Sequence, residues 1–181
     1  MTAGAKAPRG AVPGERSPLP VIDAGDEVVL RPLRADDAPA VSHILAEPEV
    51  SRWWLRQTWE RIVEEGSVSF AIEVDGEVAG VIQYVEELDP DYLSASVDLF
   101  VGAGLQERGI GRRALRAMVD FLVAEHGHHR ITVDPAADNA RAIHVYEALG
   151  FQPVGVMRAY ERGDDGVWHD GLLMEYIVPP A

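Results

Sequence analysis

The chain has 181 residues, a length that fits one domain with a sizeable core. Hydrophobic residues make up 47% of it and charged residues 25%, as in ordinary globular proteins, and no run approaches the ~20 apolar residues of a membrane helix. The formal net charge of −14 argues against nucleic acid as a partner and suits a polycationic substrate, although an acidic surface also serves solubility alone.

The N-terminal segment is expected to be a tail. The first twenty residues are rich in Ala, Gly and Pro and lack the continuous apolar core of a secretory signal. We therefore expect a disordered tail over residues 1–24 and a single domain over residues 25–181. The chain contains no cysteine, which excludes disulfides and an acyl-cysteine intermediate, and a cytoplasmic location fits.

The first half of the domain is predicted from alternation, caps and turn residues. Asp75-Gly76 is a two-residue turn typical of a hairpin between two short β-branched runs. Aspartate before an apolar run is a helix cap. In chain order we expect a strand at 28–32, a helix capped by Asp36 or Asp37 that ends before Pro48, a helix or irregular segment at 52–65, and strands at 69–74 and 78–84.

The strand, turn and helix over residues 97–122 can form an anion site. Residues 97–101 indicate a buried strand, and after Gly109 and Gly111 apolar residues recur at three- and four-residue steps, as in an amphipathic helix. Free N–H groups at a helix start bind phosphate, and glycine lets the backbone approach it. The turn alone also fits a simple tight connection. A Walker loop is excluded because Arg112 follows Gly111, and the late position in the chain fits a Rossmann unit poorly.

A second block follows downstream, in which a strand at 131–135 precedes Asp138-Asn139 and a helix from Ala140 to Leu149. Together with Gln106, Gly109 and Gly111, this block resembles the GNAT superfamily of acyl-coenzyme-A-dependent N-acyltransferases, whose asparagine-to-tyrosine helix is matched by Asn139 and Tyr146. The resemblance covers roughly Val28 to the C-terminus. More narrowly, Trp53-Trp54, Asp98 and the block after Asp134 are similar to the aminoglycoside 6'-N-acetyltransferases.

The resemblance implies an α+β fold with one mixed, mostly antiparallel central sheet flanked by helices. The predicted elements indicate the same arrangement, with residues 151–160 and 172–178 closing the chain as a second hairpin around residues 163–166. The resemblance also implies acetyl-CoA as co-substrate and direct attack of an amine on its thioester.

Asp98 and Tyr146 are the expected catalytic residues. Strand alternation puts Val97 and Leu99 on one face and Asp98 and Phe100 on the other, and a carboxylate there is a structural hydrogen-bond acceptor or a functional anion. The resemblance makes Asp98 the group that holds the substrate ammonium and accepts its proton. It makes Tyr146 the donor that protonates the departing thiolate, whereas spacing alone also fits a packed core aromatic.

Two further sets of residues are expected at the site. Asn139 is a helix cap and, by resemblance, also a coenzyme contact. One of the adjacent Trp53 and Trp54 is expected in a cleft, since both cannot point into one core. The expected coenzyme residues are Phe100, Val101, Gln106, Glu107, Arg108, Gly109, Ile110, Gly111, Arg112, Asn139 and Tyr146. The expected substrate residues are Trp53, Trp54, Tyr84, Glu86, Asp98, Asp134 and Asp170.

We therefore predict an acetyl-CoA-dependent N-acetyltransferase acting on the 6'- or 2'-amine of an aminoglycoside and conferring resistance. Its rivals are acylation of a siderophore-precursor amine, a polyamine or a protein N-terminus, and a non-catalytic acyl-CoA-binding module. Either the acidic residues at 86–91 or Asp164-Asp165 in a late turn are expected to rim the cleft. No metal is expected, because the six histidines show no metal-binding spacing, and His126, His128 and His129 lie in a glycine-containing loop with no companion cysteines or ordered carboxylates. The expected assembly is a monomer or homodimer, with no nucleic-acid or membrane partner.

Overall fold

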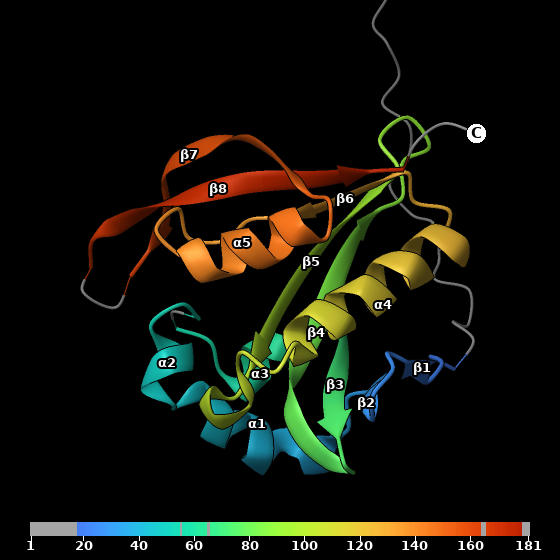
Figure 1. The fold of residues 1–181 in the computed structure, drawn as a ribbon. Helices are drawn as coiled ribbons and strands as arrows, with labels where there is room; N and C mark the ends of the chain where they lie inside the picture. Colours follow the sequence, from blue (N-terminus) through green and yellow to red (C-terminus); the bar gives the residue numbers. More distant parts are fainter. Residues whose placement is uncertain (1–17, 55, 65, 164–165, 179–181) are drawn as a thin grey trace, which may run out of the picture.

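The computed structural model describes residues 18–54, 56–64, 66–163 and 166–178. Its helical segments are η1 (Ala35–Asp37), α1 (Ala38–Leu45), α2 (Pro48–Ser51), α3 (Trp59–Ile62), η2 (Ala103–Leu105), α4 (Ile110–Ala124) and α5 (Ala140–Ala148) (Figure 1). Its strands are β1 (Ile22–Asp23), β2 (Val28–Pro32), β3 (Val68–Val74), β4 (Glu77–Glu87), β5 (Ser94–Val101), β6 (Arg130–Val133), β7 (Gln152–Arg162) and β8 (Trp168–Ile177).

The strands form one sheet in the order β1-β2-β3-β4-β5-β6-β8-β7. The pair β5–β6 is parallel, and the other neighbours are antiparallel. The prediction of a mixed, mostly antiparallel α+β sheet is confirmed. Both predicted hairpins are present, as β3–β4 and β7–β8. β1 falls within residues 1–24, the segment expected to be a disordered tail, yet it pairs with β2, so residues 22–23 belong to the sheet. Residues 1–17 of the expected tail lie outside the described residues.

The sheet separates in its middle. β5 and β6 pair only at Ala95–Ile131 and Ser96–Thr132, whereas β4 stays paired with β5 as far as Val101. Beyond Ser96 the two parallel strands diverge, as Figure 1 shows, with α4 beside β5 and α5 beside β6 and β8. The residues of β5 that follow Ser96 therefore have no strand partner on that edge.

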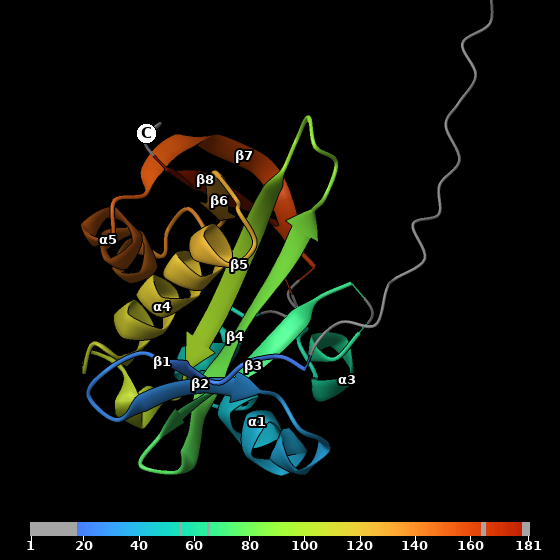
Figure 2. The ribbon, with the colours of Figure 1, turned by 90° about the vertical axis from the view of Figure 1, so that its right-hand side faces the viewer.

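Each face of the sheet carries its own apolar core. The larger core joins α4 and α5 to residues such as Ile82, Val97 and Met174. The smaller core joins α1, α2 and α3 to Val81 and Phe100. Neighbouring positions of one strand thus serve opposite cores, as strand alternation requires. Figure 2 shows α4 and α3 on opposite sides of the central strands.

The start of α1 differs in detail from the prediction. Asp37 stands at the N-cap position, but its carboxylate makes no capping bond within α1. It accepts both terminal nitrogens of Arg31 at 2.8 Å and the Arg34 N–H at 2.8 Å, while Arg31 Nε binds Glu73. The buried Arg31 guanidinium thus binds the carboxylate that was expected to cap α1, because an unpaired buried charge costs far more free energy than an uncapped helix.

The segment at 52–65 contains the single helical turn α3, which Thr58 caps through Arg61 N–H, and is otherwise irregular over its described residues. None of the described helices has the length and apolar character needed to cross a bilayer.

Candidate active site

The turn between β5 and α4 has the geometry of an anion site. Gly109 stands at the N-cap of α4 in the left-handed region, with φ of 77°, and Glu107 is also left-handed, with φ of 63°. A left-handed glycine at this position lets the chain enter the helix with no side chain in front of its first amides. Those amides have no partner inside the helix and lie at the positive end of its dipole.

The second glycine of the turn has a different role. A Cβ on Gly111 would stand 3.5 Å from Leu99 Cδ1 and 3.6 Å from Val101 Cγ2. These are ordinary van der Waals distances, so the packing of α4 on β5 leaves room for a methyl group at Gly111, whereas Gly109 sets the backbone conformation. Packing on this face also confirms the predicted alternation of β5, because Leu99 and Val101 join the larger core and Phe100 joins the smaller one.

Side chains of the turn hold it in place. Gln106 Nε2 donates to the Val101 carbonyl at 2.9 Å, and Gln106 Oε1 accepts Arg141 Nη1 at 2.6 Å. Arg113 donates to the Arg108 carbonyl at 3.0 Å and to Asp26 at 2.6 Å. Arg141, from the first turn of α5, is a basic residue at the site that the sequence analysis missed.

A cavity of about 610 Å³, the turn cavity, opens beside this turn. Its walls come from β5, the turn, the start of α4 and one face of α5, together with Trp53 and Trp54. It brings together every residue expected to bind the coenzyme: Phe100, Val101, Gln106, Glu107, Arg108, Gly109, Ile110, Gly111, Arg112, Asn139 and Tyr146. The side chain of Asn139 caps α5 by accepting the Ala142 N–H at 3.2 Å, which confirms the predicted cap.

A second cavity of about 450 Å³, the aspartate cavity, shares Trp53, Trp54, Asn139 and Tyr146 with the turn cavity. Asp98 lies in its wall, on the free edge of β5. Solvent reaches this side chain, yet protein atoms surround it closely. This desolvation, and next the charge of Asp134, raise the pKa of Asp98 to about 7. A carboxyl with that pKa can accept a proton near neutral pH.

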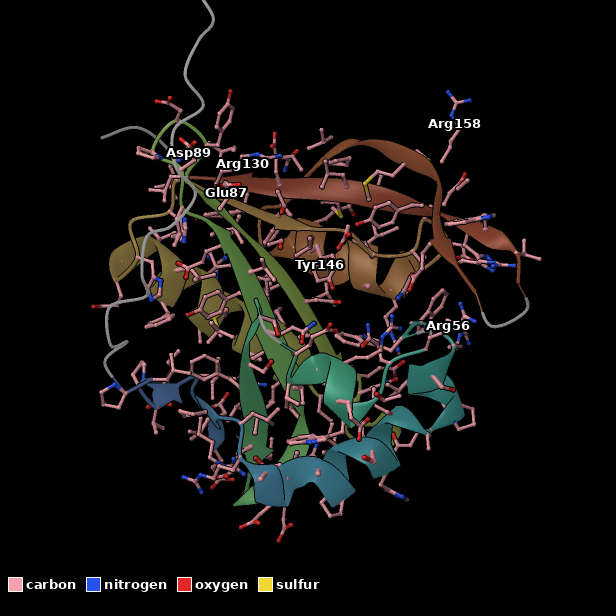
Figure 3. The ribbon with its side chains drawn as sticks, turned by 180° about the vertical axis from the view of Figure 1, so that it is seen from behind. Arg56, Glu87, Asp89, Arg130, Tyr146 and Arg158 are labelled. Atoms are coloured by element: carbon pink, nitrogen blue, oxygen red, sulfur yellow. The ribbon has the colours of Figure 1, made fainter. Side chains whose placement is uncertain are left out.

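Tyr146 reaches the same space from α5, on the far side of the split in the sheet. Figure 3 shows it in the middle of the molecule, between α5 and the central strands. Burial, and next the charges of Asp98 and Asp134, raise the pKa of Tyr146 far above its ordinary value. The phenol therefore keeps its proton at every working pH, which suits a proton donor better than a base.

Asp134 and Tyr160 form the outer wall of the aspartate cavity. The Tyr160 hydroxyl donates to Asp134 Oδ2, and burial raises the pKa of Asp134 against that bond. Both residues also line a third cavity of about 360 Å³, the outer cavity, with Asp138, Glu161, His169 and Asp170 among its walls. Carboxylates from several segments of the chain thus face connected spaces.

An irregularity in β7 brings Tyr160 and Glu161 into this wall. The β7–β8 register shifts between Met157 and Glu161, and Ala159 has a φ of 50°. Its N–H donates to Asp170 Oδ1 at 2.8 Å. Neither residue was expected at the site from the sequence, because a bulge that redirects a strand leaves no clear signal in an alternating pattern.

The expected substrate residues are not all at the site. Trp53, Trp54, Asp98 and Asp134 line the aspartate cavity, and Asp170 lines the outer cavity. Trp54 packs edge-on against Phe100 with ring centroids 4.7 Å apart, and Trp53 lies beneath the Arg52 guanidinium at 4.4 Å. Tyr84 is a correction: it is 1% exposed, stacked on Phe70 in the larger core, and lines none of these three cavities.

The acidic loop after β4 is a second correction. Glu86 accepts His126 Nδ1 at 2.7 Å and His128 Nε2 at 2.8 Å, and it lines none of the three cavities. Figure 3 shows Glu87 and Asp89 beside Arg130, at the end of the molecule away from Tyr146. The loop at 86–91 is therefore wrong as the acidic rim, and the alternative pair, Asp164-Asp165, lies outside the described residues. The described carboxylates of the cleft come from β5, from the segment after β6 and from β7–β8.

Comparison with known proteins gives three results. Residues 27–152 match the family model of the acetyltransferase (GNAT) domain. The chain is 27% identical over 139 residues to a spermidine N(1)-acetyltransferase of Escherichia coli (71% of this chain, 74% of that protein), and 26% identical over 161 residues to an aminoglycoside N(6')-acetyltransferase type 1 of Klebsiella pneumoniae (76% and 80%). A crystal structure of a Vibrio cholerae spermidine N-acetyltransferase with CoA and spermine superimposes with a TM-score of 0.72 at 18% identity, covering 84% of this chain and 96% of that one.

Proposed function

This chain belongs to the GNAT acetyltransferase family and is an N-acetyltransferase, and from that premise we propose that it acetylates an amino group of a small polycation, first of all an aminoglycoside at its 6'- or 2'-amine. The observation that carries the proposal is the set of carboxylates around the acceptor space, Asp98, Asp134, Asp138, Glu161 and Asp170. An acidic concave surface concentrates multiply charged cations. The aromatic faces of Trp53 and Tyr160 suit a sugar ring or a cation equally well.

Acetyl-CoA supplies the acyl group as a thioester, with its pyrophosphate on the amides from Glu107 to Arg112 and its acyl end toward Tyr146. The residues of the turn cavity fit this assignment: a helix N-terminus for the anionic part, an apolar strand edge, and Arg108, Arg112 and Arg141 for further phosphate charge. No cysteine exists to carry an acyl group, so the amine attacks the thioester directly.

Asp98 takes the proton from the substrate ammonium, because only the neutral amine has a lone pair for attack. As the carbon–nitrogen bond forms and the carbon–sulfur bond breaks, Tyr146 donates its proton to the departing thiolate. The attacking nitrogen loses its second proton as it becomes an amide nitrogen, and that proton returns through solvent to the Tyr146 phenolate. The raised pKa of Asp98 supports its assignment, since this carboxyl exchanges protons near neutral pH, and the raised pKa of Tyr146 means that the phenol carries a proton before the reaction.

The test is release of free thiol from acetyl-CoA across matched amines: an aminoglycoside, spermidine, a monoamine of similar size and a peptide with an N-terminal alanine. We expect the highest kcat/KM with the aminoglycoside, and mass spectrometry should locate one acetyl group on its 6'- or 2'-nitrogen. A clear preference for spermidine would keep the polycation and replace the aminoglycoside, which the 27% identical spermidine relative makes the second candidate. A preference for the monoamine or the peptide would refute the polycation proposal.

A further inference from the structure

A second group of converging side chains lies away from the active site. Glu86 stands near the end of β4, and His126 and His128 follow α4, at the end of the molecule where Figure 3 places Glu87 and Arg130. Glu86 Oε1 is 2.7 Å from His126 Nδ1 and 2.8 Å from His128 Nε2, and the three donor atoms lie within 4.8 Å of one another. We propose that Glu86, His126 and His128 bind a divalent transition-metal ion of the zinc class.

The local structure fixes both imidazole rings. Gly127 between them is left-handed, with φ of 72°, so the chain reverses and both histidines face Glu86. The side chain of His128 is 0% exposed, and its backbone N–H donates to the Leu122 carbonyl at 3.2 Å. His126 packs against the rings of Phe121, at 4.8 Å, and Tyr84, at 5.8 Å. The donors are thus set before an ion arrives, which keeps the entropic cost of binding low.

The donor set matches zinc chemistry. Two imidazole nitrogens and one carboxylate oxygen are a known zinc set, with a further position left for water. Tetrahedral bonds of ~2.0–2.2 Å place neighbouring donors ~3.3–3.6 Å apart, so Glu86 Oε1 must move away from each ring nitrogen by about 0.5–0.9 Å. Its side chain is 12% exposed and that of His126 is 28% exposed, which leaves a path for an ion from solvent.

The competing interpretation is a hydrogen-bond network alone, in which both neutral rings donate to one carboxylate oxygen. His128 Nδ1 is a buried atom without a hydrogen-bond partner among the described residues in either arrangement. The proposal also departs from the sequence-based expectation of no metal, which missed Glu86 because it lies forty positions before His126.

The experiment is calorimetric titration of the tag-free, chelator-treated full chain with Zn²⁺, repeated with Co²⁺ as a spectroscopic probe. We expect one ion per chain, a higher Tm with the ion, and visible Co²⁺ d–d bands of a low-coordinate site. Glu86→Gln and His126→Gln should each weaken binding at least tenfold. His129→Gln is the matched control, because this exposed neighbour lies outside the cluster, and it should bind like the wild type.

Two outcomes would overturn the proposal: no binding by the wild type at 1 mM Zn²⁺, or equal binding by the wild type and both cluster variants. Circular dichroism should first establish that each variant is folded. His126→Gln is the safer variant, since His126 is the more exposed of the two histidines. If Glu86→Gln fails to fold, the comparison of His126→Gln with His129→Gln still decides the question.

Discussion

Asp98 combines an expected catalytic role with an unfavourable environment, and replacing it with asparagine should separate the two effects. Its pKa in the folded protein is about 7, against an ordinary value of 3.8. Between these two values the folded chain keeps a proton that the unfolded chain has lost. Stability must therefore fall as pH rises from about 4 to about 7. Asp98→Asn removes this dependence, so the variant should be the more stable protein above pH 7.

The size of the gain follows from the pKa difference. Three units correspond to about 4 kcal/mol if the group is fully desolvated. Because solvent reaches Asp98, we discount this to about 1–2 kcal/mol. For a chain of this length that is a rise in Tm of about 2–8 °C. The gain should appear at pH 8 and vanish near pH 4, where the wild-type carboxyl is protonated in both states.

Two measurements check the reasoning. Melting curves at pH 4 and pH 8 give the stability difference, and thiol release gives kcat/KM, which should fall by at least about 100-fold in the variant at pH 8. In the wild type kcat/KM should decline about tenfold per pH unit below pH 7. Two amines of different pKa identify this limb, since the limb that stays fixed belongs to Asp98. A variant that is less stable than the wild type at pH 8 would show instead that Asp98 is a structural acceptor.

The remaining predictions concern the coenzyme turn, the proton donor, the cleft charge and a buried ion pair. Gly109→Val should raise KM for acetyl-CoA at least tenfold, about 1.4 kcal/mol, because the φ of 77° at Gly109 excludes a β-branched residue. Gly111→Ala should raise KM far less, because the added Cβ meets its neighbours only at 3.5 Å or more. Equal effects of the two variants would contradict the proposed geometry of the anion site. Tyr146→Phe should bind acetyl-CoA normally but lower kcat ~10²–10⁴-fold; full activity would mean that water protonates the thiolate. Raising salt from 0.01 to 0.15 M shortens the Debye length from ~30 to ~8 Å, so kcat/KM should fall for a polycation and much less for a monoamine. If kcat/KM for the polycation does not change with salt, the net charge serves solubility alone. Asp37→Asn should destabilise the fold by about 2–4 kcal/mol at pH 7, because it leaves Arg31 without its bidentate partner. Since Arg31 lowers the pKa of Asp37, the stability difference between wild type and variant should shrink as pH falls below 4. A stability difference that is independent of pH would contradict the charge argument.

The sequence predicted those parts of the site that depend on local patterns. The anion turn, the alternation of β5 and the cap at Asn139 each follow from a few neighbouring residues, and each is found in the structure. Simple period-two reasoning could also have placed Tyr84 correctly, because it lies in phase with the buried Ile82. The error came from ending the strand at residue 84, when β4 continues to Glu87.

The rest of the site depends on long-range geometry. Tyr160 reaches the cavity only because a bulge redirects β7, and Arg141 reaches it through Gln106, thirty-five positions earlier. The acidic residues after β4 were assigned by charge alone, and charge does not say at which end of a strand a loop emerges. Asp37 was assigned to a cap without knowledge that Arg31 lies within reach.

The early end of the β5–β6 ladder has a consequence for how such enzymes diversify. The space beside β5 lies against main chain that lacks a strand partner on that edge and against the glycine turn. The opposite wall is assembled from side chains of separate segments, around Trp53, Asp134 and Tyr160. Substitutions in that wall can change which amine is accepted without moving the strand edge against which the acyl donor is expected to lie. A lineage can therefore change its acceptor amine by a few substitutions in that wall, while β5 and the glycine turn stay in place.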